Sequence, residues 1–312
     1  MIKTLKNALR QNRGENPIPR KVQDIIPVRT VYPDGIFLSG KNTYSRSYRF
    51  RDINYAVASR AVQEAMFLGY SGILNSFDSG ATTKITANNR SLNLVDFERD
   101  ILLDMKKDQN DCYRMESNGI MRSRATGADA TVQDKYVTIS VVKNSIEDAR
   151  VYFSRVGADL ISHFSQLGSQ CAELNTSERL RIIHDFFRAG EETAFYFDMK
   201  DSMRKGHSFA DYICPDSYEH HDSYFKIGGR YGRVLLLRDY ASYIKDSMIA
   251  ELTDINRNMM LSIDVIPVPT DEAVKEVEQR LLGVETNITN WQRKQNMNNN
   301  CLLYTSPSPR DS

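Results

Sequence analysis

The stretch Lys135-Tyr-Val-Thr-Ile-Ser-Val-Val142, followed closely by Ser145-Ile-Glu-Asp148, decides the fold. Its β-branched and aromatic residues predict a strand over 135–142. Ser145 can accept a hydrogen bond as an N-cap, and the acidic residues after it suit the first turn of a helix. The helix that follows ends at Gly168 and carries its apolar residues at spacings of three and four. Those residues are Ala149, Tyr152, Phe153, Val156, Leu160, Phe164 and Leu167.

Toward the N-terminus, alternating apolar residues and turn residues predict a three-stranded meander. Its strands are expected at 26–32, 36–38 and 44–50, with turns at 33–35 and 40–42. A helix is expected over 56–77, with Val57, Ala61, Ala65, Leu68, Gly72, Ile73 and Phe77 on its apolar face. A strand over 82–87, a short helix over 95–105 and a longer helix before Thr131 complete this half.

Toward the C-terminus, the pattern predicts a strand over 171–174 and a helix to Arg188 capped by Thr176 or Ser177. A hairpin is expected over 224–237, a helix over 240–256 and a strand over 259–268. The last helix starts near Thr270 and spaces its apolar residues as the a and d positions of a coiled coil do. These are Val274, Val277, Leu281, Val284, Ile288 and Trp291. Packing of this seam on the preceding sheet is the alternative.

The predicted fold is therefore α+β, with mixed or antiparallel sheets and packed helices in two subdomains. The first subdomain covers 25–190, a connection without periodicity covers 191–222, and the second subdomain covers 223–297. Residues 1–24 hold six basic residues against two acidic ones, and form a basic flexible arm. Contact of this arm with an anionic membrane surface is the alternative interpretation.

The end of the chain differs from the rest in origin. Residues 301–311 resemble the translation of a transposase-based sequencing adapter, so we expect 301–312 to be an artefactual tail. An ordinary Ser/Pro-rich tail is the alternative. On the first interpretation, the natural protein continues beyond Asn300 and this chain is an N-terminal fragment.

Composition excludes several classes of protein. The 312 residues contain 41 Lys and Arg against 40 Asp and Glu, a net charge of +1, which does not suit bulk nucleic-acid binding. The hydrophobic share of 41% is that of an ordinary globular protein. No apolar run is long enough to form a membrane-spanning helix. The four cysteines form no CxxC pair and indicate thiols in a reducing cytoplasm.

No motif in the sequence indicates a catalytic, cofactor-binding or metal site. Gly35-Ile-Phe-Leu-Ser-Gly40-Lys41-Asn42 has the spacing of a phosphate-binding loop, but Asn42 replaces the Mg²⁺-binding Ser or Thr and the intervening residues are bulky. Gly228-Gly-Arg-Tyr-Gly232 lies between strands and predicts a hairpin. His220 and His221 are adjacent and lack a third ligand at suitable spacing, whereas His163 and His184 suit packing or surface positions on helices.

Tyr44-Ser-Arg-Ser-Tyr-Arg-Phe50 interleaves aromatic and basic residues. On a strand, Tyr44, Arg46, Tyr48 and Phe50 share one face. Such a face suits a platform for single-stranded nucleic acid, and it also suits an ordinary exposed sheet face, which the near-neutral charge favours.

Several stretches, in their order and spacing, resemble the N-terminal region of one family. They are Val22–Pro27, Tyr32-Pro-Asp-Gly-Ile36, Phe50-Arg-Asp-Ile-Asn-Tyr55, Gly69–Asp78, Phe97-Glu-Arg99, Lys135-Tyr-Val-Thr-Ile139, Ala149-Arg150 and Ser177-Glu-Arg-Leu180. The family is the conjugative-transfer ATPase of type IV secretion systems, in the VirB-type/TraE group of Gram-positive mobile elements. The similarity runs from Val22 to Arg188 and continues more weakly to the final helix.

The resemblance implies a cytoplasmic motor, peripheral to the cell membrane, whose N-terminal portion docks on the secretion channel. It implies a RecA-like ATPase domain beyond this chain, which binds ATP and Mg²⁺ and forms a homo-oligomer. No residue here matches the family's Walker motifs, so the docking portion alone is expected to lack ATPase activity. The alternative function is a stand-alone interaction protein, or one that handles single-stranded nucleic acid, in the same apparatus.

Overall fold

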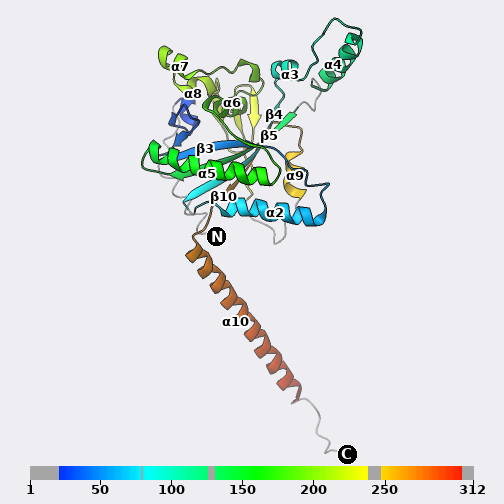
Figure 1. Ribbon diagram of the computed structural model, residues 1–312. Helices are drawn as coiled ribbons and strands as arrows, with labels where there is room; N and C mark the ends of the chain where they lie inside the picture. Colours follow the sequence, from blue (N-terminus) through cyan, green and yellow to red (C-terminus); the bar gives the residue numbers. More distant parts are fainter. Residues whose placement is uncertain (1–20, 79, 126–130, 238–246, 304–312) are drawn as a thin grey trace, which may run out of the picture. The chain divides into compact units, whose positions relative to one another are not determined.

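The computed structural model describes residues 21–78, 80–125, 131–237 and 247–303 (Figure 1). The chain divides into two compact units, Met1–Val265 and Ile266–Ser312. The first unit has an α+β fold, and every strand pair described in it is antiparallel.

The main sheet of the first unit contains seven strands. Its order is β1 (Thr30–Val31), β2 (Phe37–Ser39), β3 (Thr43–Phe50), β5 (Thr131–Val142), β4 (Ala81–Ser91) and β10 (Met259–Val265). The short strand β6 (Cys171–Glu173) pairs with the end of β3. A second sheet joins β7 (Tyr218–His220), β8 (Phe225–Ile227) and β9 (Arg230–Gly232).

The strand and helix that decide the fold lie at its centre. Strand β5 pairs with β3 along one side and with β4 along the other. Its residues Val137, Ile139 and Val141 alternate into the core, where α5 (Ile146–Gln166) packs. Ser145 caps α5 as predicted, because its side chain accepts a hydrogen bond of 3.1 Å from the Asp148 amide.

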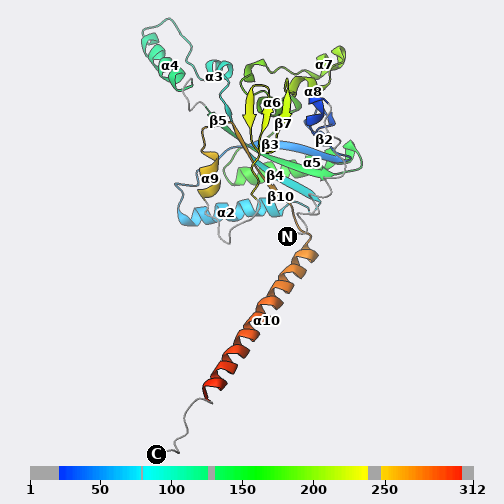
Figure 2. The same cartoon turned by 180° about the vertical axis from the view of Figure 1, so that it is seen from behind.

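Helices cover both faces of the main sheet. On one face, α5 and α2 (Arg60–Asn75) enclose a core that includes Tyr44, Tyr48 and Ile73. Figures 1 and 2 show these two helices side by side. On the other face, Phe37 packs with buried residues of α6 (Thr176–Phe187) and α8 (Phe209–Ile213).

The remaining elements lie around these layers. They are the 3₁₀ turns η1 (Val22–Ile25) and η2 (Glu192–Ala194), and the helices α3 (Leu94–Asp100), α4 (Asp111–Ala125), α7 (Met199–Lys205) and α9 (Ser247–Thr253). The second unit contains α10, which spans Thr270–Leu303.

Most predicted elements form, but the chain divides at Val265 instead of at 191–222. The reason is that β10 pairs with β4 over seven residues, so the strand expected in a second subdomain completes the first sheet. The expected connection also contains η2, α7 and α8, and α8 contributes Ala210 and Ile213 to the core.

Three local predictions need correction. Asn175, and not Thr176 or Ser177, caps α6, because its side chain accepts from the Glu178 amide at 2.9 Å. The second hairpin strand is β9, and 234–237 lies outside the described helices and strands. Helix α10 ends at Leu303, beyond the boundary at 297 expected for the second subdomain. Most of the basic arm (1–20) and residues 304–312 lie outside the described residues.

Candidate functional site

The stretch with phosphate-loop spacing is a structural turn. Gly35 has a left-handed backbone with φ of +79°, and a Cβ there would lie 2.3 Å from the Leu174 carbonyl oxygen. Its amide donates to Thr176 Oγ1 at 3.1 Å, so this N–H is committed within the protein. Lys41 lies in the exposed turn between β2 and β3, as the sequence predicted.

Arg179 of α6 fixes the same turn through hydrogen bonds to its backbone. The guanidinium is buried and donates to the carbonyl oxygens of Gly35 and Ser45, at 2.8 and 2.7 Å. It also donates to the Ser45 hydroxyl at 3.1 Å and lies 3.9 Å from the centre of the Phe37 ring. Burial lowers the pKa of Arg179 to about 9, and the nearby Arg46 acts in the same direction. Because these partners are backbone oxygens, the Ser45 hydroxyl and a core ring, the arrangement is structural.

Other stretches singled out in the sequence also contact one another. Asp34 forms an ion pair of 2.7 Å with Arg150 of α5, which joins the Tyr32–Ile36 stretch to Ala149-Arg150. Asp52 forms an ion pair of 2.5 Å with Lys135, at the start of the Lys135–Ile139 stretch. The ion pairs of Asp34 with Arg150 and of Asp52 with Lys135 therefore hold the turn and the sheet edge in place. The sequence alone did not reveal these contacts.

The histidines singled out in the sequence do not form a metal site among the described residues. His221 stacks on Tyr224 with ring centres 4.4 Å apart, and its Nε2 lies 3.6 Å from Glu219. His184 is buried in α6, with its Nδ1 3.1 Å from Asp185. His163 is partly buried on α5. The glycines at 228 and 229 form the turn between β8 and β9, as predicted.

The aromatic and basic face of β3 points into the protein. Tyr44 and Tyr48 are core residues beneath α5, and Arg46 forms an ion pair of 2.6 Å with Glu173. The prediction of an exposed sheet face was therefore wrong. Both faces of β3 are covered, because Ser45 and Ser47 are buried on the other side. The Tyr44 and Tyr48 rings lack the free faces on which bases could stack.

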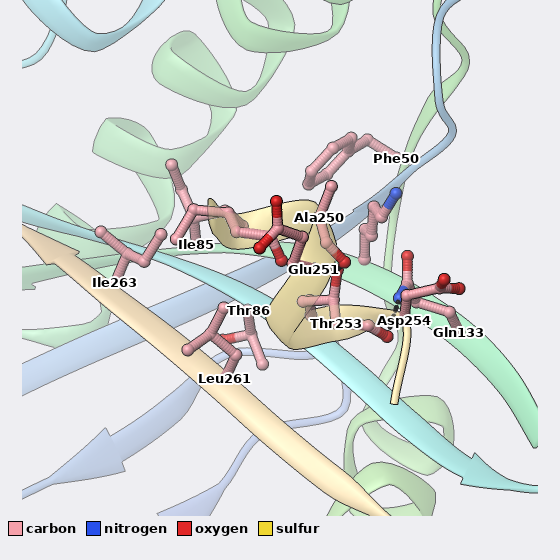
Figure 3. A pocket seen from close by; sticks show the side chains of 13 residues that line it. Phe50, Ile85, Thr86, Gln133, Ala250, Glu251, Thr253, Asp254, Leu261 and Ile263 are labelled. Atoms are coloured by element: carbon pink, nitrogen blue, oxygen red, sulfur yellow. Dashed lines mark hydrogen bonds between the residues drawn. The ribbon is translucent and has the colours of Figure 1, made fainter. Parts of the chain in front are cut away.

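A pocket of about 530 Å³ lies between the sheet and α9 (Figure 3). Apolar side chains of three strands form much of its lining: Phe50 of β3, Ile85 of β4, and Leu261 and Ile263 of β10. Residues Ile249, Ala250 and Glu251 of α9 line the opposite side. The lining is largely apolar, which suits an apolar group.

Polar contacts at the end of α9 fix this helix on the sheet. Asn89 donates to the carbonyl oxygens of Thr253 and Ile255, at 2.6 and 3.0 Å. Gln133 donates to the same Thr253 oxygen at 3.0 Å. These bonds satisfy carbonyl groups that a helix end leaves without internal partners. Lys135, at the pocket's edge, is held by Asp52. The pocket residues thus have positioning contacts and no arrangement of nucleophile and base.

Groups of exposed apolar residues lie elsewhere in the first unit. On α2, Phe67 and Leu68 are 63% and 68% exposed. The inner side of α2 is instead formed around Gly69 and Ile73, where Gly69 approaches Leu167 at the C-cap of α5. Val234, Leu235 and Leu236 form a continuous apolar run, each at least 80% exposed. Exposed apolar residues that are grouped in this way are typical of protein interaction sites.

We call Phe67 and Leu68 the α2 surface and take it as the candidate functional site. The sequence does indicate an exposed apolar surface on this helix, because α2 contains more apolar residues than one packed face can bury. The predicted face was right at Ile73 and Phe77, which are buried in the core, and wrong at Val57 and Leu68, which are exposed.

Compared with known proteins, the chain matches no family model, and no curated protein is significantly similar to it. Among the described residues, no helix has both the length and the apolar character that crossing a membrane requires.

Proposed function

We propose that this chain is the docking and assembly region of an ATPase that energises conjugative DNA transfer through a type IV secretion system. The observation that carries the proposal is the α2 surface, where two large apolar side chains of one helix are mostly exposed. The resemblance of residues 22–188 to that family supplies the identity of the apparatus. The partner is then a component of the secretion channel, and the protein works at the cytoplasmic face of the membrane.

The proposal assigns ATP and Mg²⁺ to a motor domain encoded after Asn300. The genomic reading frame tests this assignment directly. A downstream G-x-x-x-x-G-K-[ST] sequence supports the proposal, whereas a nearby stop codon contradicts it and leaves a stand-alone accessory protein. The purified chain is expected to show no Mg²⁺-dependent ATP turnover, because phosphoryl transfer needs the Walker residues. ATP turnover by this chain would contradict the assignment of ATP hydrolysis to a separate motor domain.

Docking is tested by charge substitution on the α2 surface. Phe67→Glu and Leu68→Glu place a carboxylate where an apolar partner would lie, and each should lower transfer frequency from donor cells by about tenfold or more. Val151→Glu is the matched control, because Val151 is 75% exposed on α5 and lies outside the α2 surface. Thermal unfolding should be nearly unchanged in all three variants, since exposed positions contribute little to stability. Unchanged transfer by the α2 variants would refute this surface as the docking site.

A further inference from the structure

Helix α10 carries an apolar seam that the structure leaves exposed. The six seam residues follow spacings of three and four, with Val274, Leu281 and Ile288 at a positions and Val277, Val284 and Trp291 at d positions. Each of them is between 50% and 71% exposed. A helix in water gains most of its stability by burying such a stripe, so this seam needs a covering partner.

The charges beside the seam indicate what that partner is. Position g of the first heptad, 274–280, is Arg280, and position e of the second heptad is Glu285. In a parallel pair of helices, a g residue faces the e residue of the following heptad in the partner helix. Arg280 of each copy would therefore face Glu285 of the other, which gives two attractive pairs related by symmetry.

The other orientation places like charges together. In an antiparallel pair the e positions of the two helices face each other, so Glu278 would lie against Glu285 of the second copy. In the parallel pair, Glu278 faces Ala273 and meets no carboxylate. Arg280 is available for exchange, because its ion pair with Glu276, of 2.6 Å, is on its own exposed helix surface.

We propose that α10 forms a parallel two-stranded coiled coil with a second copy of this chain, through the seam Val274–Trp291. Away from the seam of the first heptad, Lys275, Glu276 and Gln279 at b, c and f are polar, as this arrangement requires, whereas Leu282 at the next b position is apolar. The proposal does not depend on the proposed function, because it concerns α10 alone and not the α2 surface.

The association can be followed in the whole chain by sedimentation velocity and by the fluorescence of Trp291, the only tryptophan. Dimers should form as concentration rises, and the Trp291 emission should shift to shorter wavelength as the ring leaves water. A chain that stays monomeric up to roughly 100 µM would overturn the proposal.

Two neighbouring leucines provide a matched pair of variants. Leu281→Asp places a charge in the seam and should abolish dimers. Leu282→Asp makes the same change at a b position that is 62% exposed, and should leave dimers intact. Circular dichroism checks that both variants keep their helix content. Equal effects of the two variants, or a dimer that survives Leu281→Asp, would show that the chain associates through another surface.

Charge exchange tests the orientation. Glu285→Arg should weaken the parallel dimer by about tenfold, because it sets two cations against each other in both symmetric pairs. Adding Arg280→Glu should restore most of the affinity. If Glu285→Arg strengthens the dimer instead, the helices are antiparallel and the proposed arrangement is wrong.

Discussion

Alanine substitutions at Gly35 and Gly40 test whether this stretch is a structural turn or a nucleotide-binding loop. Gly35 and Gly40 both have positive φ, at +79° and +60°, and they are the two glycines of the phosphate-loop spacing. A phosphate loop would need both for binding. The structure gives them unequal roles, so Gly35→Ala and Gly40→Ala should differ strongly in stability.

The expected difference follows from what a new Cβ would contact. Alanine in left-handed backbone costs about 1–2 kcal/mol at either position. At Gly40 the nearest atom, Thr43 Oγ1, is 3.9 Å away, so the total stays near this value. At Gly35 the Leu174 carbonyl oxygen lies 2.3 Å from the new Cβ and must move by about 1 Å to reach ordinary contact. That movement weakens the bond that the Gly35 amide donates to Thr176 Oγ1 and the bond that Arg179 donates to the Gly35 carbonyl oxygen, which adds about 2–4 kcal/mol.

Thermal unfolding followed by circular dichroism measures both variants. For a chain of this size, Gly35→Ala should lower the melting temperature by about 10 °C and Gly40→Ala by about 3 °C. ATP and Mg²⁺ should leave both melting temperatures unchanged, since neither glycine contacts a nucleotide in this proposal. Equal melting temperatures of the two variants, or an unchanged melting temperature of Gly35→Ala, would contradict the structural role of Gly35.

Two further predictions concern packing and thiol chemistry. Gly157→Ala should destabilise the chain by about 1 kcal/mol, because the new methyl would lie 2.5 Å from the hydroxyl of the buried Tyr48 and outweigh the gain in helix propensity. Gly72→Ala has open space and should stabilise by about 0.5–1 kcal/mol in the same denaturant titration. Burial raises the pKa of Cys171 to about 11, so its thiolate is scarce at pH 8 and alkylation should be much slower than at the exposed Cys112. Peptide mapping by mass spectrometry after brief iodoacetamide treatment checks this, and equal labelling of both thiols in the folded chain would contradict it.

The elements that sequence predicted well are those whose signals are local. Strand β5 and helix α5 form where β-branched residues, an N-cap and a regular apolar face agree. The capping bond of Ser145 and the closing glycine at 168 are set by residues a few positions apart. Local agreement of this kind is what makes an element recognisable before its neighbours are known.

The wrong predictions concern features that depend on contacts between residues far apart in the sequence. The pairing of β10 with β4 brings together residues more than 160 positions apart, and nothing local to either strand specifies it. The inner side of α2 is set by the approach of Gly69 to Leu167, and a helix with several apolar sides cannot indicate which one is covered. The apolar run at 234–237 resembles a strand in composition, yet it has no described partner to extend the small sheet beyond β9.

The residues that carry the resemblance and the residues that could bind a partner are largely different sets. Asp34 forms an ion pair with Arg150, and the guanidinium of Arg179 is bound to the Gly35 turn. These residues therefore stabilise the fold and are not available to bind a partner. The α2 surface shows no such internal pairing, because Phe67 and Leu68 are exposed and gain from burial only when something covers them. Substitutions in the first set should therefore reduce stability and activity together. Under the proposed function, substitutions in the second set should reduce transfer in a protein that remains folded, and that difference would distinguish the proposed docking surface from the scaffold that holds it.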